Sequence, residues 1–205
     1  MDRSSIRSLF PIVHRNYLFS CIPGRVLPDT EQMSFENYRL IYPCPKRSLT
    51  PDMLAAIGLD QRSLDYRLEA GDNLGVILYE DRIAHRSLVQ TRGFAAMEGD
   101  TRAIRLLPGQ IYVHYCETVT DQRGRGLYST MLKAIISATL NEANVNEILI
   151  ACHQGNVSSI RGILRAGFTY KRSSIAISAF RGQLRYSYWY SEPVINFGSH
   201  NATQH

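Results

Sequence analysis

The sequence has little of what several classes of protein depend on. Its four cysteines lie far apart in 205 residues, without a C-x-x-C pair, so we expect reduced thiols rather than a disulfide framework, and no metal site. No apolar run approaches the roughly 20 residues that cross a bilayer. The first residues lack the long apolar core of a secretion signal, and we therefore expect a cytoplasmic protein without membrane insertion.

A dense basic patch is also absent. The formal net charge is +5, but the 23 lysine and arginine residues are spread along the chain, and no clear aromatic stripe accompanies them. Binding to nucleic acid is therefore not expected. A small anionic ligand accounts for the charge equally well. The hydrophobic fraction of 44% and the charged fraction of 20% are ordinary for a folded protein.

Strand and helix patterns alternate along the chain. Apolar runs bounded by turn residues predict strands at 14–22, 37–44, 73–80, 83–90, 110–119, 146–152, 176–180 and 183–190. Helical spacing predicts helices at 50–58, 60–71, 127–140 and 156–167, with N-caps at Thr50, Asp60 and Asn156 and stops at Gly58, Gly71 and Gly167. We expect one α/β domain at 37–191, an N-terminal arm or extra strand or helix at 1–36, and a polar tail at 192–205.

The stretch Arg123–Tyr128, RGRGLY, joins the strand at 110–119 to the helix that follows. Glycines leave backbone N–H groups unobstructed, a helix N-terminus carries partial positive charge, and two arginines add full charges. A polyphosphate is the ligand that such a turn is expected to bind. The stretch is not a Walker loop, and it lacks the third glycine of a dinucleotide fingerprint because Ser129 stands there. A plain turn with solvated arginines is the alternative.

A second motif follows at the expected distance: Asn156 and Ser159, then a helix that ends in Gly167 and Phe168. Together the two motifs and the order of elements resemble the GCN5-related N-acetyltransferase (GNAT) superfamily over about residues 37–190. Its phosphate loop reads Arg or Gln, two residues, Gly, one residue, then Gly or Ala. The resemblance implies a single-domain α/β fold with a mixed central sheet, splayed between its fourth and fifth strands, and helices on both faces.

The same resemblance implies acetyl-CoA, and therefore coenzyme A, as the cofactor. Its pantetheine arm would bind backbone groups of Cys116, Thr118 and Val119. Its pyrophosphate would bind the amides of the loop, and its pantetheine or adenine side would contact the second motif. The implied loop and second-motif residues are Arg123, Gly124, Arg125, Gly126, Leu127, Tyr128, Asn156 and Ser159.

Catalysis needs a base that takes the proton of the attacking amine. Period-two alternation along the predicted strand at 110–119 would put Tyr112, His114, Cys116 and Thr118 on one face. His114 is the first candidate, because an imidazole titrates near neutral pH; a packed strand histidine is the alternative. Glu117, expected on the opposite face, is the second candidate, and an ion pair with an arginine is its alternative role.

The sequence departs from the family pattern at two places. Tyr128 fills a loop position where Gly or Ala is usual, so its side chain must point away from the phosphates. Ile163 stands where many members carry the tyrosine that protonates the leaving thiolate. Water is our first candidate for that acid, with Tyr170 and Tyr128 as alternatives. Cys152 is expected to be a buried thiol rather than a nucleophile.

These features predict an acetyl-CoA-dependent N-acetyltransferase that acts on a small primary amine by direct transfer. An amino sugar or sugar nucleotide is the first guess for the acceptor, from a loose likeness to members associated with surface polysaccharides. Two alternatives stay open: a non-catalytic acyl-CoA-binding module, and an acyltransferase that uses a longer acyl donor. The expected partner is a small molecule, and a homodimer is left open.

Overall fold

The protein is known from a computed structural model that describes residues 12–24, 37–56, 61–95, 103–140, 142, 144–179 and 184–191. The main strands are β1 (Ile12–Cys21), β2 (Tyr38–Ile41), β3 (Asn73–Tyr79), β4 (Arg82–Gln90), β7 (Gln110–Thr118), β8 (Glu147–His153), β9 (Thr169–Ala179) and β10 (Leu184–Tyr190). Two short strands are β5 (Phe94–Ala95) and β6 (Ile104–Arg105). The helices are α2 (Pro51–Ala56), α3 (Gln61–Glu69), α4 (Leu127–Thr139) and α5 (Val157–Arg165), with short 3-10 turns at Lys46–Ser48 and Thr120–Gln122.

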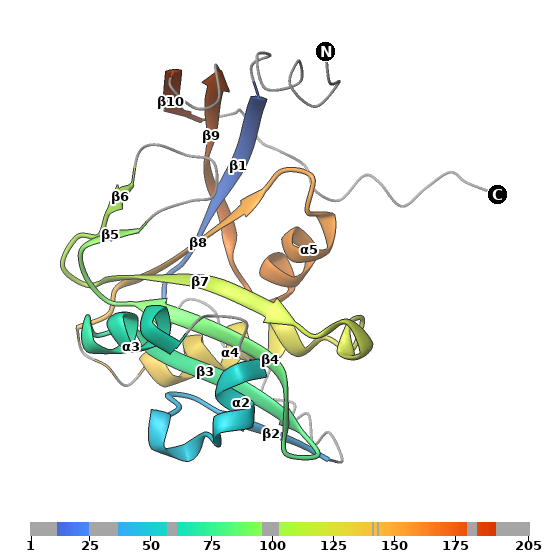
Figure 1. The fold of residues 1–205 in the computed structure, drawn as a ribbon. Coiled ribbons are helices and arrows are strands. Elements are labelled where there is room, and N and C mark those ends of the chain that lie inside the picture. Colours follow the sequence, from blue (N-terminus) through green and yellow to red (C-terminus); the bar gives the residue numbers. More distant parts are fainter. Residues whose placement is uncertain are drawn as a thin grey trace, which may run out of the picture.

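Eight strands form one mixed sheet in the order β10-β9-β1-β8-β7-β4-β3-β2 (Figure 1). Within the described part of this sheet, β7 and β8 are the parallel pair, and each of the other neighbours is antiparallel. A parallel pair needs a long crossover, which α4 supplies between the two strands. The predicted α/β fold with a mixed sheet is therefore confirmed.

The strand predicted near the N-terminus is present and lies inside the sheet. β1 pairs with β8 on one side, where Leu18 faces Ala151, and with β9 on the other, where Val13 faces Ile177. The first described segment of the chain thus joins the C-terminal hairpin of β9 and β10 to the middle of the sheet.

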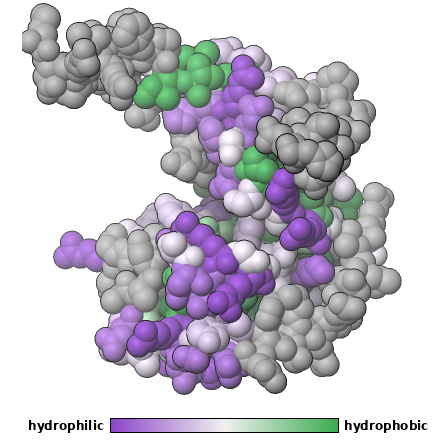
Figure 2. Space-filling model, turned by 90° about the vertical axis from the view of Figure 1, so that its right-hand side faces the viewer, coloured by the Kyte–Doolittle hydropathy of each residue, from purple (hydrophilic) through white to green (hydrophobic). Residues whose placement is uncertain are grey.

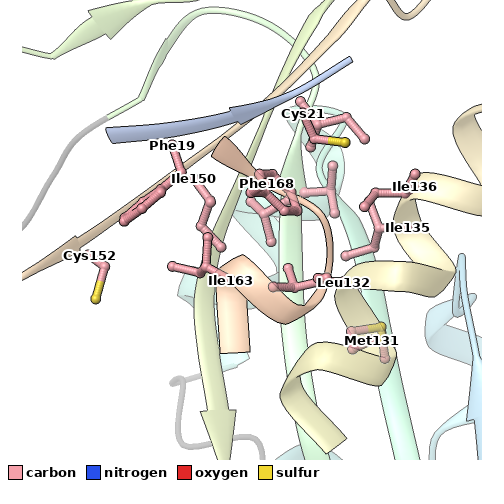
Figure 3. Packing of buried hydrophobic residues seen from close by; sticks show 14 of the residues in the cluster. Phe19, Cys21, Met131, Leu132, Ile135, Ile136, Ile150, Cys152, Ile163 and Phe168 are labelled. Carbon is pink, nitrogen blue, oxygen red and sulfur yellow. The ribbon is translucent and has the colours of Figure 1, made fainter. Parts of the chain in front are cut away.

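Helices cover both faces of the sheet, as predicted. α4 and α5 bury their apolar sides on one face, where Met131, Ile135 and Ile163 belong to one buried cluster with Phe19 and Ile150 (Figure 3). α2 and α3 lie on the opposite face, over the half that β3 and β4 form. The other half of that face is covered by the segment of β5 and β6, whose Ala95 and Ile104 pack on Tyr112 and Leu149.

The helix signals in the sequence have the expected geometry where they can be checked. The Met53 amide donates to Thr50 Oγ1 (3.3 Å), and the Ser159 amide donates to Asn156 Oδ1 (3.1 Å). Gly71 and Gly167 end their helices with φ of 95° and 96°. The predicted signals at Gly58 and Asp60, and the predicted tail at 192–205, lie outside the described residues.

None of the helices in the described ranges is both long enough and apolar enough to span a lipid bilayer.

Candidate active site

The sheet opens between its two parallel strands. β7 and β8 are paired from Gln110 with Glu147 as far as Val113 with Ile150, and the register ends there although both strands continue. Residues after Val113 therefore have no sheet partner on the β8 side. This is the predicted splay, and it leaves backbone groups free to bind an extended ligand.

A cavity of about 1110 Å³ occupies this opening. It is bordered by both strands and reaches helices on both faces of the sheet. Figure 2 looks at the side toward which β7 runs, and it shows a hollow between the upper and lower parts of the molecule. We call two groups of lining residues the α5-side wall (Tyr128, Cys152, Asn156, Ser159) and the α3-side wall (Arg67, Asp72, Arg92, His114, Tyr115).

A bulge in β7 corrects the predicted alternation of faces. Leu88 of β4 faces His114 and Arg86 faces Glu117, so two residues of β7 stand opposite one residue of β4. Tyr115 in the bulge has a φ of 48°. The extra residue returns Cys116 to the face of α4, where it packs on the core, while His114 lies on the α3 side. The expectation that His114 and Cys116 share a face is therefore wrong.

A buried arginine holds this bulge in place. Arg86 Nη1 donates to the Tyr115 carbonyl oxygen over 2.8 Å, and Nη2 donates to Glu117 Oε2. The Arg86 side chain is only 8% exposed, whereas that of Glu117 is 53% exposed. Glu117 thus has the ion-pair role that we named as its alternative, and it is not part of the cavity lining.

The turn after β7 leaves several amides unoccupied. Gly124 and Gly126 have φ of 79° and 77°, values that only glycine adopts without strain. Within the described residues, no backbone hydrogen bond uses the amides of Gly124, Arg125 or Gly126. The first turn of α4 follows directly, and its N–H groups have no partner within the helix. The geometry of this turn, with amides that no backbone acceptor uses at the start of a helix, is of the kind that can bind an anion.

The space around the turn is open, which an incoming phosphate requires. A Cβ atom built on Gly124 would meet nothing within 4 Å, and one on Gly126 would meet only Ser129 Oγ at 3.8 Å. Arg125 is exposed, and Arg123 Nε donates to the Thr118 carbonyl over 3.1 Å. Val119 is a correction, since its N–H already donates to Ala84 O and is not free for a pantetheine arm.

Tyr128 stands on the first turn of α4 and crosses to α5. Its ring lies against Gly162, where a Cβ atom would come within 2.7 Å of Tyr128 Cδ1. The hydroxyl interacts with the thiol of Cys116, and burial raises the pKa of Tyr128 well above its ordinary value. The ring therefore fills the site beside Ile163, which is fully buried in the core and carries no acid. The contacts of this side chain are thus with α5 and with Cys116 of β7.

The same part of the cavity holds weakly acidic thiols. Burial raises the pKa of Cys116 to about 11 and that of Cys152 to about 11, and it raises the pKa of Tyr112 as well. All of these groups are neutral at physiological pH. A surface of neutral groups suits an uncharged thioester, and the raised pKa of Cys152 makes its thiol a poor nucleophile.

The α3-side wall is charged. His114 Nε2 lies 3.3 Å from Asp72 Oδ2, and both side chains are at most 10% exposed. This nitrogen has no hydrogen bond of good geometry among the described residues. Arg67 Nη1 lies 3.9 Å from Asp72 Oδ2, while Arg67 Nη2 donates to the Tyr115 hydroxyl over 2.9 Å.

Sequence reasoning placed His114 in the site but missed Asp72, Arg67 and Arg92. The one signal for Asp72 was its position directly after the helix stop at Gly71 and before a strand. Tyr170 is not among the lining residues: its hydroxyl lies 2.8 Å from Ser173 Oγ and its ring packs on Tyr17. Of the three candidate catalytic residues, His114 alone lines the cavity.

Asn156 and Ser159 line the other end of the cavity, at the N-terminus of α5. Asn156 Oδ1 accepts hydrogen bonds from the Ser158 hydroxyl (3.0 Å) and the Ser159 amide (3.1 Å), so this side chain is both helix cap and lining residue. Of the first motif, Tyr128 is the residue that lines the cavity together with Asn156 and Ser159 of the second; the predicted residues Arg123–Leu127 are not among the lining residues.

No protein-family model and no curated protein matches the sequence. Solved structures match by fold. A GCN5-related N-acetyltransferase from Kribbella flavida aligns with a TM-score of 0.53 and 13% identity, over 80% of this chain and 57% of its own. An acetyltransferase of the GNAT family from Colwellia psychrerythraea gives 0.50 and 13%, over 84% and 58%. A tandem GNAT protein from the clavulanic acid biosynthesis pathway gives 0.56 and 13%, over 91% and 55%.

This chain spans little more than half the length of each of these three proteins. At such identities the likeness establishes the architecture alone. The fold of this chain is that of the GCN5-related N-acetyltransferase superfamily.

Proposed function

We propose that the protein transfers an acetyl group from acetyl-CoA to a small primary amine. One observation carries the proposal: a single cavity crosses the sheet at the splay, with a neutral wall beside an amide-rich turn and a wall that holds His114 and Asp72. An elongated, anionic thioester fits the first part. A proton acceptor is present in the second.

The protein would bind and position acetyl-CoA without forming a covalent bond to its acetyl group. The amides at 124–126 and the first turn of α4 would bind the pyrophosphate, and the unpaired edge of β7 after Val113 would bind the pantetheine arm. Asn156 and Ser159 would contact the arm from α5. Acetyl-CoA supplies an activated acetyl group, and holding it beside the amine can contribute about 7–11 kcal/mol toward the barrier.

The α3-side wall would supply the base that accepts the proton of the amine. A neutral His114 takes the proton that the amine must lose as its nitrogen bonds to the carbonyl carbon and the C–S bond breaks. The carboxylate of Asp72, 3.3 Å from Nε2, stabilises the imidazolium that results. Asp72 is therefore a positioning residue for the base.

The leaving thiolate needs a proton as well. Tyr128 is a lining residue and interacts with the Cys116 thiol, and its raised pKa keeps the hydroxyl protonated at physiological pH. We assign it as the donor of this proton, in place of the tyrosine absent at position 163, with water as the alternative. Tyr170 has no part in this scheme.

The finer parts of the proposal concern the setting of the reaction. An amino sugar or sugar nucleotide remains the first acceptor class to try, and the cytoplasm, where thiols stay reduced, is the proposed location. The expected domain at 37–191 is extended by β1, because that strand pairs with β8 and β9 inside the sheet. The second candidate function is an acyl-CoA-binding module without turnover. The absence of an acid at Ile163 favours it.

Thermal stability with acetyl-CoA, coenzyme A, ADP and free pantetheine tests the cofactor. We expect acetyl-CoA and coenzyme A to raise the melting temperature, since both would bind the folded state alone. Mass spectrometry of an amine panel incubated with acetyl-CoA, propionyl-CoA and octanoyl-CoA then separates the functions. Stabilisation without product from any donor would favour the binding module, and no stabilisation by either coenzyme would refute both.

A further inference from the structure

The α3-side wall carries opposite charges at two depths. Asp72 is buried beside His114, with a side chain 6% exposed, whereas Arg92 is an exposed residue of the same cavity. An amine acceptor would place its ammonium near the inner negative charge before it loses a proton. The guanidinium of Arg92 has no role in that loss of a proton.

Arg92 is held by the backbone rather than by an acid. Its Nε donates to the Ala70 carbonyl over 2.9 Å. Its guanidinium lies over Gly71, where a Cβ atom would come within 3.3 Å of Nη2, so the absence of a side chain there makes room for it. In the ranges that the structure describes, Arg92 forms no ion pair. It is a guanidinium held by the backbone, and no carboxylate in the described ranges pairs with its charge.

Arg67 differs in this respect. It approaches Asp72, donates to the Tyr115 hydroxyl, and its guanidinium carbon lies 4.3 Å from the centre of the Tyr115 ring. Its guanidinium is therefore engaged within the wall, chiefly by the hydroxyl and ring of Tyr115. Of these two arginines, Arg92 is therefore the one that can bind an anionic group of a ligand.

We propose that the acceptor is an amine that also carries an anionic group, a carboxylate or a phosphate, and that Arg92 binds this anion. The proposal rests on the proposed function, because it assigns the acceptor of that reaction. The ammonium lies toward Asp72 and His114, and the anion lies at the outer arginine. Guanidinium binds both anions through paired N–H groups, so the two classes share one site.

The rings between these charges fit the body of such an acceptor. Tyr66 and Phe94 line the same cavity and are 74% and 66% exposed, and Tyr115 is 46% exposed. They come from α3, β5 and β7, so the chain presents them together only after folding. Aromatic faces cover the apolar faces of a sugar or a ring while leaving both charged ends to their partners.

Two matched pairs of amines test the proposal through activity: glucosamine against glucosamine 6-phosphate, and tyramine against tyrosine. Each pair differs by one anionic group, and together they separate phosphate from carboxylate. We expect kcat/KM to be at least about tenfold higher for the anionic member of one pair. Arg92→Gln should remove that preference by slowing the anionic member alone, and Arg92→Lys should keep part of it.

Arg62→Gln is the matched control, since Arg62 is an exposed arginine of α3 outside the cavity lining. It should leave both members of each pair unchanged. Equal kcat/KM within both pairs in the wild type, or a preference that survives Arg92→Gln, would overturn the proposal.

A second measurement needs no turnover. Coenzyme A is added to saturation so that the phosphate turn is filled, and inorganic phosphate or acetate is then compared with chloride at equal ionic strength by thermal shift. Phosphate or acetate should stabilise the wild type, and Arg92→Gln should lose that stabilisation. An unchanged shift in Arg92→Gln, or none in the wild type, refutes the anion site. If coenzyme A itself fails to bind, the proposed function fails, while dependence on Arg92 can still be measured without it.

Discussion

The two walls of the cavity are built in different ways. The α5-side wall and its phosphate turn come from two short stretches, 123–128 and 152–159, and each leads into a helix. The α3-side wall collects single charged side chains from places far apart in the sequence. Arg67 belongs to α3, Asp72 and Arg92 follow separate elements, and His114 belongs to β7.

This difference separates two kinds of recognition. Backbone amides at glycine positions bind a feature that every donor of one class shares, and they require a fixed local conformation. Side chains from separate helices and strands bind the groups that differ from one acceptor to another. Their relative positions depend on the register in which the strands pair. Variants of the two walls should therefore change different quantities: donor affinity on one side, turnover and acceptor choice on the other.

The largest effect is expected on the α3-side wall. His114→Gln removes the base, so turnover with the best amine of the panel should fall about 10²–10⁴-fold. Affinity for coenzyme A should stay the same, because His114 lies on the opposite side of β7 from Cys116 and α4. Steady-state kinetics and calorimetry measure the two quantities. A similar loss of coenzyme A affinity would contradict the division between the walls.

The pH profile of the same variant adds a sharper test. A neutral imidazole base works less as the pH falls, so the acidic limb of the wild type should vanish in His114→Gln. His85 cannot supply that limb, because burial, and next the charge of Arg86, lower its pKa to about 3. The His85 side chain is therefore neutral above about pH 3 in the folded protein, whereas in the unfolded chain it takes up a proton below about pH 6.5. Acid therefore favours unfolding, and the stability of the protein must be checked at each pH.

The next effect belongs to the phosphate turn. Gly126→Glu puts a Cβ at a φ of 77°, which costs about 1–2 kcal/mol, and it sets a carboxylate against the diphosphate. Affinity for coenzyme A should fall about 100-fold by calorimetry, which corresponds to about 2.7 kcal/mol.

Gly24→Glu is the matched control, because Gly24 has a φ of 87° and open space around it but lies in a turn after β1. It should cost similar stability and leave coenzyme A affinity unchanged. Equal losses of affinity in both variants would mean that strain, rather than the phosphate site, explains the result.

The sequence predicted the local structure of the glycine turn and of the Asn156 cap for a physical reason. A glycine turn between a strand and a helix, and an asparagine cap, are local devices whose conformation depends on neighbouring residues. The alternation along β7 is local too, yet one inserted residue at Tyr115 reverses it, and Arg86 of another strand holds that bulge. No pattern within 110–119 reveals a partner that is about thirty residues away.

The α3-side wall was hidden for a related reason. Asp72 and Arg92 are ordinary surface residue types in turns. Only the pairing of β3 with β4, and of β4 with β7, brings Asp72 beside His114 and places Arg92 in the lining of the same cavity. The prediction for Val119 is wrong for the same kind of reason. Its place in the motif suggested a free amide, but that amide donates to the carbonyl oxygen of Ala84 in β4. Hydrogen-bond partners across a sheet are properties of its register.

A smaller effect should follow from the loss of the Tyr128 hydroxyl. Tyr128→Phe keeps the ring against Gly162 and removes the proton donor. Turnover should fall about tenfold, less than the roughly 10²–10⁴-fold typical of a general acid, because water can also protonate a thiolate. Tyr170→Phe, which loses the contact of the hydroxyl with Ser173 outside the cavity lining, should change turnover less than about twofold. The reverse ranking would move the acid to β9.

The smallest effect tests how the Tyr128 ring is positioned. In Gly162→Ala the new Cβ would lie 2.7 Å from Tyr128 Cδ1, so the ring must shift away from α5. Overpacking of about 1–3 kcal/mol is partly offset by the better helix propensity of alanine, about 1 kcal/mol, so the melting temperature should fall by only a few degrees. Turnover should fall several-fold if the hydroxyl must stay near Cys116. Gly155→Ala is the matched control, because its Cβ would meet only the His153 side chain, at 3.3 Å. Full turnover in Gly162→Ala, together with a slow Tyr128→Phe, would show that the hydroxyl acts without a fixed ring, and the contact between α4 and α5 would then serve stability alone.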